Sequence, residues 1–219
     1  MQFALITIFP EMFTALTDFG VIGRAIKEGV VGVEFINPRT FTTDNYRRID
    51  ERPFGGGPGM VMMAEPLYQS IQHAKKILGA DTKVIYLSPQ GKVFKQEDAG
   101  SLLKLKKAIL LCGRYEGVDQ RLLDHCVDMQ ISIGDFVVSG GELPAMLIMD
   151  AMVRLIPGVL NDDNSSVHET HQGEFFDYPN YTAPRVWQDL PVPEVLLSGD
   201  HKAIDAWRDA EARRRTLLR

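Results

Sequence analysis

The chain has 219 residues, of which 45% are hydrophobic and 24% are charged. This composition is that of a globular protein and excludes disordered and fibrous classes, and the longest apolar stretches fall short of the roughly 20 residues that a membrane helix needs. The formal net charge of -5 excludes a general attraction to polyanions, so a nucleic acid would have to bind local basic clusters such as Arg47–Arg48 or Arg213–Arg215.

Strand-like and helix-like segments alternate along most of the chain. The strand patterns cover residues 3–9, 31–36, 84–87, 108–112, 127–133 and 136–138, and the helical patterns cover residues 11–18, 20–27, 67–78, 96–105 and 118–126. Alternation of this kind predicts an α/β fold, a mostly parallel sheet covered by helices. Met1 leads directly into the first strand pattern without a basic leader, so we expect no signal peptide and a cytoplasmic protein.

The segment 143–156 predicts a helix that is apolar nearly all round. Its only charged residues are Asp150 and Arg154, which lie four apart and therefore on one face, where we expect an ion pair. A helix of this kind must be buried on most sides, which indicates a subunit interface as well as a core. The polar segment 161–174 is too long for a routine connection and predicts a domain boundary, followed by a proline-punctuated stretch and a helix over 200–214.

Glycine-bearing turns follow three of the predicted strands. Two of them are Ser88–Gly91 and Gly113–Gly117, and the third contains Gly134, Gly140 and Gly141. Because glycine has no Cβ, a loop built from Gly134, Gly140 and Gly141 can take positive φ and let peptide groups touch a bound molecule. The carboxyl ends of parallel strands meet at one edge of a sheet, so the three turns predict one shared pocket.

Two further patterns are weaker. The run 55–59, Gly-Gly-Gly-Pro-Gly, lacks the Gly-Lys-Ser/Thr of a phosphate-binding loop, and we expect a flexible turn that closes on a substrate. His168 and His171 flank Glu169, but their spacing matches no strong zinc signature and disfavours a structural metal. Glu169 on a loop beside a pocket is a candidate general base, whereas composition alone favours an ordinary solvated carboxylate.

A resemblance to one family covers essentially the whole chain and rests on seven segments. They are 52–60 (RPFGGGPGM), 84–91 (VIYLSPQG), 112–117 (CGRYEG), 132–145 (SIGDFVVSGGELPA), 156–160 (IPGVL), 178–182 (YPNYT) and 195–199 (VLLSG). In combination they are highly specific, and they closely resemble the bacterial tRNA (guanine-N1)-methyltransferase family.

The resemblance implies a SPOUT-type fold in which the glycine loops form a deep trefoil knot, although sequence rules alone predict an unknotted sheet. It implies a methyltransferase domain over 1–160 that binds S-adenosylmethionine, a mobile linker over 161–175, and a small, mainly helical C-terminal domain over 176–219 that binds tRNA. It also implies a homodimer with the active site at the subunit interface. The implied reaction transfers a methyl group from S-adenosylmethionine to N1 of the guanine immediately 3′ of the anticodon, position 37 of tRNA.

The resemblance also implies roles for single residues. Arg154 and Glu169 fall on the family's catalytic pair, with Glu169 where the family usually has aspartate, so His168 and His171 are minor rival bases. Glu116 is linked to the Mg²⁺ dependence associated with the family, and no metal ligand is assigned. Cofactor contacts are implied for Tyr86, Leu87, Ser88, Pro89, Gly113, Arg114, Tyr115, Glu116, Gly117, Ser132, Ile133, Gly134, Asp135, Phe136, Val137, Val138, Gly140, Gly141 and Pro144. Substrate contacts are implied for Asp50, Arg52, Gly59, Thr170, Arg208 and Arg215.

Two other functions stay open at this point. One is a methyltransferase of the same fold that acts on ribosomal RNA or on a ribose hydroxyl. The other is a non-catalytic RNA-binding module, which the departure from aspartate at Glu169 keeps in play. Methyl transfer to defined tRNA transcripts separates all three.

Overall fold

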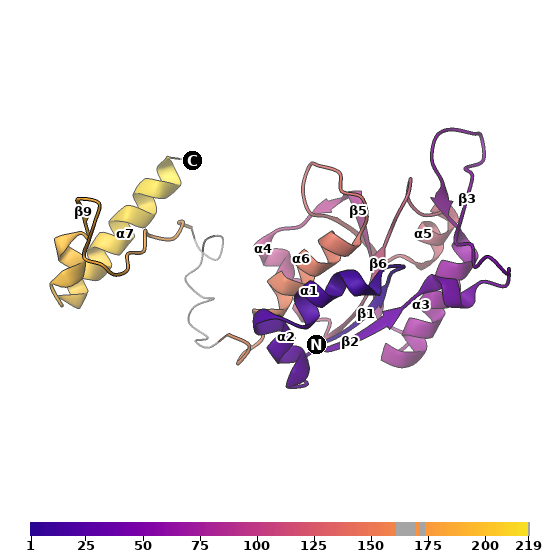
Figure 1. Cartoon of the computed structure of the whole chain (residues 1–219), viewed down its shortest axis with the longest axis horizontal. Helices are drawn as coiled ribbons and strands as arrows, with labels where there is room; N and C mark the ends of the chain where they lie inside the picture. Colours follow the sequence, from indigo (N-terminus) through magenta and orange to yellow (C-terminus); the bar gives the residue numbers. More distant parts are fainter. Residues whose placement is uncertain (161–169, 171–173, 219) are drawn as a thin grey trace. The chain divides into compact units, whose positions relative to one another are not determined.

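The computed structural model describes residues 1–160, 170 and 174–218, and the chain divides into two compact units, 1–161 and 162–219 (Figure 1). The division falls at the start of the polar segment in which the sequence predicts a domain boundary. Each unit has its own helices and strands, and the first contains the five-stranded sheet.

The first unit is built on a five-stranded sheet with the order β2-β1-β6-β5-β7, in which every neighbouring pair is parallel. Its strands are β1 (Gln2–Ile6), β2 (Gly32–Ile36), β5 (Lys83–Val93), β6 (Lys107–Cys112) and β7 (Met129–Ser132). A short antiparallel pair, β3 (Asp50–Glu51) with β4 (Val61–Met62), lies outside this sheet. The mostly parallel α/β sheet predicted from the alternating pattern is confirmed.

Helices cover both faces of the sheet. They are η1 (Pro10–Phe13), α1 (Thr14–Thr17), α2 (Gly20–Lys27), η2 (Pro38–Phe41), α3 (Ala64–Leu78), α4 (Gln96–Leu103), α5 (Gln120–Cys126) and α6 (Glu142–Val153). Successive strand residues point to opposite faces, so Phe3 and Leu5 join a core with α2, α4 and α6, whereas Ala4 and Ile6 join a core with α3 and α5 (Figure 1). Both cores are needed because a parallel sheet is apolar on both sides.

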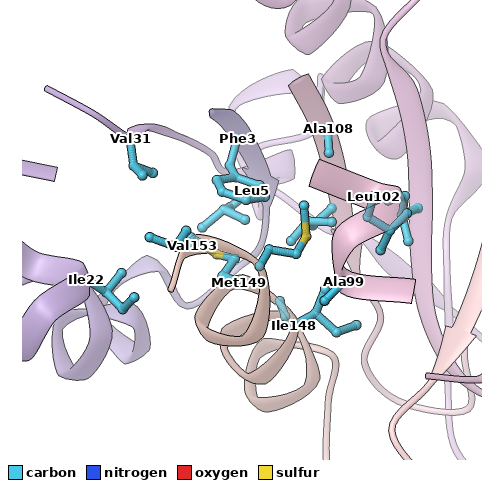
Figure 2. Close-up of a cluster of buried hydrophobic side chains, with 14 of the residues drawn as sticks. Phe3, Leu5, Ile22, Val31, Ala99, Leu102, Ala108, Ile148, Met149 and Val153 are labelled. Atoms are coloured by element: carbon cyan, nitrogen blue, oxygen red, sulfur yellow. The ribbon is translucent and has the colours of Figure 1, made fainter. Parts of the chain in front are cut away.

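Helix α6 occupies the centre of the first of these cores. Ile148, Met149 and Val153 are fully buried; Met149 and Val153 lie on the side of the strand residue Leu5, whereas Ile148 lies beside Ala99 of α4 (Figure 2). The predicted apolar helix is therefore present, beginning one residue earlier than the pattern indicated and ending at Val153. The subunit interface inferred from its apolar surface stays a prediction.

Met149 gives a direct test of this core. Replacing Met149 by Ala should lower the free energy of unfolding by about 2–5 kcal/mol, because the removed atoms leave a cavity in a fully packed interior. Urea denaturation followed by circular dichroism would measure the loss. Ile77→Ala, on the exposed side of α3, is the control and should change stability by only about 0.5 kcal/mol. Equal effects of the two variants would contradict the packing described here.

Two local predictions are wrong. The segment 136–138 is not a strand: Phe136 and Val137 are exposed, and no described strand pairs with them, so the apolar run covers a loop. The predicted helix over 11–18 is instead the short 3₁₀ turn η1 followed by a single turn, α1, because Pro10 starts the turn and the chain bends at Asp18. Hydrophobicity alone does not show whether a short apolar run has a pairing partner.

The second unit contains the hairpin β8 (Val186–Trp187) with β9 (Leu190–Pro191), the turn η4 (Glu194–Leu197) and the long helix α7 (His201–Leu217). The Asp200 side chain caps α7 by accepting the backbone N–H of Ala203 at 3.2 Å. Aromatic residues supply the packing in place of a large core, with Arg208 over the ring of Tyr178 and Tyr181 beside Trp207. The expected small, mainly helical C-terminal unit is confirmed, and its helix extends three residues beyond the predicted end.

Candidate active site

A pocket of about 380 Å³ lies where the three glycine-bearing segments meet, at the carboxyl ends of β6 and β7 and against the middle of β5. Of the residues implied to contact the cofactor, all but Gly134 and Asp135 line it. The single shared pocket predicted from three separate strand ends is therefore present in the fold. That this pocket binds a cofactor stays a prediction.

The segment Ser88–Gly91 differs from its prediction. It does not end a strand; it lies within β5, which pairs with β7 on both sides of it. Leu87 and Lys92 both pair with Ile131, so the residues between them bulge out of the ladder toward the pocket. Glycine at position 91 allows β5 to pair with β7 again after the bulge, because a Cβ there would collide with the backbone of Gln130 and Ile131.

The loop after β6 is tied to the neighbouring segment by peptide hydrogen bonds. The Glu116 N–H donates to the Met60 carbonyl and the Met62 N–H donates to the Gly117 carbonyl, each at 2.9 Å. Tyr115, which lines the pocket, adopts the left-handed conformation at φ 60°, which is strained for a residue with a side chain. Gly113 is required by close approach, since a Cβ there would lie 2.8 Å from the Tyr86 ring.

The loop after β7 uses its glycines in two ways. Gly134 has φ 147°, as predicted, and its neighbour Ser132 closes the turn by donating its hydroxyl to the Gly134 carbonyl at 2.9 Å. Gly140 and Gly141 could have adopted positive φ as well, but neither does. They are needed because other atoms leave no room for a Cβ: the Arg114 side chain at Gly140, and at Gly141 the Cα of Cys112, at 2.7 Å.

A second, more open pocket of about 480 Å³ adjoins the first. Arg114, Tyr115, Glu116 and Ser139 line both pockets, so a molecule in one would lie beside a molecule in the other. Gly59, implied to contact substrate, lines the second pocket at φ 79°, where a Cβ would strike the Glu116 carboxylate. This arrangement suits a reaction between two bound molecules.

The other residues implied to contact substrate lie in different places. Asp50 lies near the Tyr115 side chain, and partial burial together with that carboxylate raises the pKa of the Tyr115 phenol. Arg52 lines neither of the two pockets, and its N–H donates to the Glu51 carboxylate at 3.0 Å. Thr170, Arg208 and Arg215 belong to the second unit, where the Thr170 hydroxyl accepts the N–H of Asp177 at 3.1 Å.

The implied catalytic pair is only partly described. Arg154 is half-buried at the C-terminal end of α6, one turn after the exposed Asp150. Their predicted ion pair stays a prediction. Glu169, His168 and His171 lie outside the described residues.

Several pocket residues were not identified from the sequence. They are Gln90, Val118, Gln120, Leu123, Ile131 and Ser139. Gln90 and Ser139 lie inside motifs that were recognised, so the motif boundaries could have included them. Gln120 and Leu123 come from α5, whose pattern indicates only an amphipathic helix, and tertiary packing alone brings them to the pocket.

Two searches of the described residues gave negative results. Among residues 1–160, 170 and 174–218, no group of three or more His, Cys, Asp or Glu side chains could hold a metal ion. Within that same part of the chain, every helix is too short or too polar to cross a lipid bilayer.

Cys112, at the end of β6, provides a probe of this region. It is fully buried, and burial raises the pKa of its thiol well above the usual value, an effect to which the nearby Glu142 carboxylate adds. We expect iodoacetamide at neutral pH to leave Cys112 unmodified in the native protein and to label Cys126, which is only half-buried, instead. Peptide mass spectrometry before and after urea denaturation would measure this. Native labelling of Cys112 would show that the strand end opens.

Comparison with known proteins agrees with this geometry. The family model described as "tRNA (Guanine-1)-methyltransferase TrmD" matches residues 1–219. A protein of Burkholderia vietnamiensis named tRNA (guanine-N(1)-)-methyltransferase is 53% identical over 221 residues, 99% of this chain and 84% of its own length. A Burkholderia mallei protein of the same name is 51% identical over 223 residues, 100% of this chain and 84% of its own length. The crystal structure of tRNA (m1G37) methyltransferase from Aquifex aeolicus superposes with a TM-score of 0.79 at 38% identity, covering 94% of this chain and 87% of that one. This chain, with its parallel sheet and its pocket of glycine loops, therefore belongs to the tRNA (guanine-1)-methyltransferase family.

Proposed function

We propose that this protein transfers a methyl group from S-adenosylmethionine to N1 of the guanine at position 37 of tRNA, immediately 3′ of the anticodon. The observation that carries the proposal is the pocket at the carboxyl ends of β6 and β7, lined by backbone from three segments and adjoined by a second pocket, in a chain of this family. An enzyme with this substrate would act in the cytoplasm, where tRNA is used.

The pocket fits a nucleoside-containing cofactor. Its volume lies within the range of about 300–1,000 Å³ that is usual for small-molecule sites. Peptide groups around Leu87, Gly113 and Ile133 would hold adenine and ribose, which are recognised by hydrogen bonds in a fixed geometry. Glu116 lines both pockets and would lie near the methionine end, where it would also account for the Mg²⁺ dependence that we propose. When bound, the cofactor supplies an electrophilic methyl group on a sulfonium.

Methylation of guanine at N1 requires two side chains, a base and a group that stabilises negative charge. N1 carries a proton at neutral pH and is a poor nucleophile, so a base must remove that proton as the methyl group is transferred. We assign this step to the Glu169 carboxylate. Negative charge develops on O6 at the same time, and we assign its stabilisation to the Arg154 guanidinium, which emerges from the end of α6.

The architecture of the active enzyme is also part of the proposal. We propose that the loops after β6 and β7 are threaded as a trefoil knot, which is supported by the contact of Gly141 with Cys112 and Gly113. We further propose a homodimer whose active sites lie between subunits, supported by the exposed Leu143 and Leu147 on the largely buried helix α6. Residues 161–175 would be the linker, and residues 176–219, with Arg208 and Arg215, would bind tRNA.

A radiolabel transfer assay tests the proposal. The purified protein would be incubated with methyl-labelled S-adenosylmethionine and tRNA transcripts that carry guanine or adenine at position 37. We expect transfer to the guanine transcript only, with the label recovered as N1-methylguanosine. Label on ribose or on the adenine transcript would favour a different methyltransferase, and calorimetric binding of the cofactor without any transfer would favour a non-catalytic RNA-binding module.

A further inference from the structure

The first residue of α6, Glu142, is a carboxylate buried completely inside the protein. Both of its oxygens are occupied: the Thr7 hydroxyl donates to Oε1 at 2.8 Å and the Arg114 Nε donates to Oε2 at 2.9 Å. Thr7 follows β1 and is itself fixed, since its hydroxyl accepts the N–H of Phe9 at 3.0 Å. A buried charge is maintained only where partners of this kind compensate it. The three side chains therefore join the ends of β1 and β6 to the start of α6.

Arg114 is almost as fully engaged as Glu142, with 16% of its side chain exposed. Besides the bond to Glu142, its Nη1 donates to the Ser139 carbonyl at 3.2 Å and its Nη2 to the Met12 sulfur at 3.1 Å. Its guanidinium also stacks on Phe9, 4.6 Å from the ring centroid. Three of the five guanidinium N–H groups, one on each nitrogen, thus donate within the protein, which points to a structural role for Arg114.

The course of this side chain determines the shape of both pockets. Arg114 passes so close to Gly140 that a Cβ there would collide with Nε, and the adjacent Gly141 N–H donates to the Gly113 carbonyl at 2.8 Å. The loop after β7 is thereby held against the loop after β6. Arg114 and Ser139 line both the cofactor pocket and the adjoining pocket, so a shift of either would alter the two walls together.

We propose that Thr7, Glu142 and Arg114 form a positioning network that holds the Ser139–Gly141 loop against the loop after β6, and that Arg114 acts through this loop instead of on the cofactor or the guanine. The inference deepens the proposed function and rests on it. It assigns a role to the buried carboxylate and explains why Gly140 must be glycine.

The variant Glu142→Gln tests the network, because the amide keeps the size of the side chain but leaves the Arg114 charge without its partner. We expect the Kd to rise about ten-fold for both S-adenosylmethionine and S-adenosylhomocysteine, and single-turnover methyl transfer to slow by about a hundred-fold. The two ligands differ in the sulfonium charge, so calorimetry with both separates geometry from electrostatics. A loss confined to S-adenosylmethionine would show charge compensation alone and overturn the positioning role.

Three further variants complete the test: Arg114→Gln, the double variant that combines it with Glu142→Gln, and Thr7→Val. The Nε2 atom of a glutamine at position 114 would occupy the place of the Arg114 Nε. The double variant Glu142→Gln with Arg114→Gln leaves no buried charge alone, so its fold-loss in affinity should be smaller than the product of the two single fold-losses. Losses that multiply would overturn the network. Thr7→Val removes only one donor and should weaken both ligands about three-fold, which keeps the test decisive if Glu142→Gln does not fold. Unchanged affinities in Thr7→Val would contradict the proposal.

Asp128→Asn is the matched control. Asp128 also accepts two hydrogen bonds, from the Lys83 ammonium at 2.7 Å and the Val84 N–H at 2.8 Å, but at the opposite end of β5 from the pocket. It should lower the melting temperature without changing either affinity. If Glu142→Gln behaves in the same way, Glu142 is merely structural and the inference fails. If the wild-type protein itself neither binds the cofactor nor methylates tRNA, the proposed function fails instead.

Discussion

Replacing Glu169 by Gln should lower the single-turnover rate of methyl transfer by about 10²–10⁴-fold, the usual contribution of a positioned general base. The amide cannot accept the N1 proton of guanine, whereas nothing in cofactor recognition by the loops after β6 and β7 depends on it. The affinity for S-adenosylmethionine, measured by calorimetry, should therefore stay within about two-fold of the wild-type value. The rate is measured with saturating cofactor and excess enzyme over tRNA.

Two control variants make this prediction specific. Glu174→Gln removes an exposed carboxylate nearby in the sequence and should leave the rate within a few-fold of wild type. Glu169→Asp keeps a carboxylate and should remain active. Activity of Glu169→Gln within a few-fold of wild type would assign the base to His168 or His171, which alanine variants of those residues would then separate.

The second large effect is expected at Gly141. A Cβ there would lie 2.7 Å from the Cα of Cys112 and 2.9 Å from the backbone nitrogen of Gly113, and neither atom can move without shifting a buried strand end. We expect Gly141→Ala to lower the free energy of unfolding by about 1–3 kcal/mol and to abolish measurable cofactor binding, because the strain falls on the pocket wall. Denaturant titration and calorimetry measure the two effects.

Gly100→Ala is the matched control for this substitution. Gly100 lies within α4 with no atom within 4 Å of the position of a Cβ, so alanine should stabilise the protein by about 0.5–1 kcal/mol through its higher helix propensity. Cofactor affinity should not change. If Gly141→Ala binds the cofactor as well as Gly100→Ala does, the close approach of the two loops is not what shapes the pocket.

Much of the fold could be predicted from local pattern. The helix over 20–27 was predicted with the bounds of α2, and the strand predicted over 108–112 is β6, which begins only one residue earlier, because periodicity reports which side of an element is buried. The apolar run 136–138 was predicted as a strand but is a loop. Local pattern could not show this, because distant segments determine whether a run is buried and has a pairing partner. The extension of β5 beyond Gly91 depends likewise on β7.

The candidate site was predicted unevenly. Motifs indicated the glycine loops, because glycine is required wherever backbone must approach closely, but they did not indicate which glycines need positive φ and which need empty space. Gln120 and Leu123 reach the pocket from the side of a helix and carry no motif. The sequence likewise placed Arg114 in the pocket without indicating its buried partner, which lies 28 positions away at the start of α6.

The amino-acid sequence by itself determined the family, the parallel α/β class and the segments that surround the pocket, because motif spacing and hydrophobic period are properties of neighbours along the chain. The tertiary structure alone decided that Thr7, Arg114 and Glu142 share one buried network and that β5 resumes beyond its bulge. Those features depend on contacts between residues far apart in the chain, and the free energy of a buried charge is set by whatever the fold brings beside it.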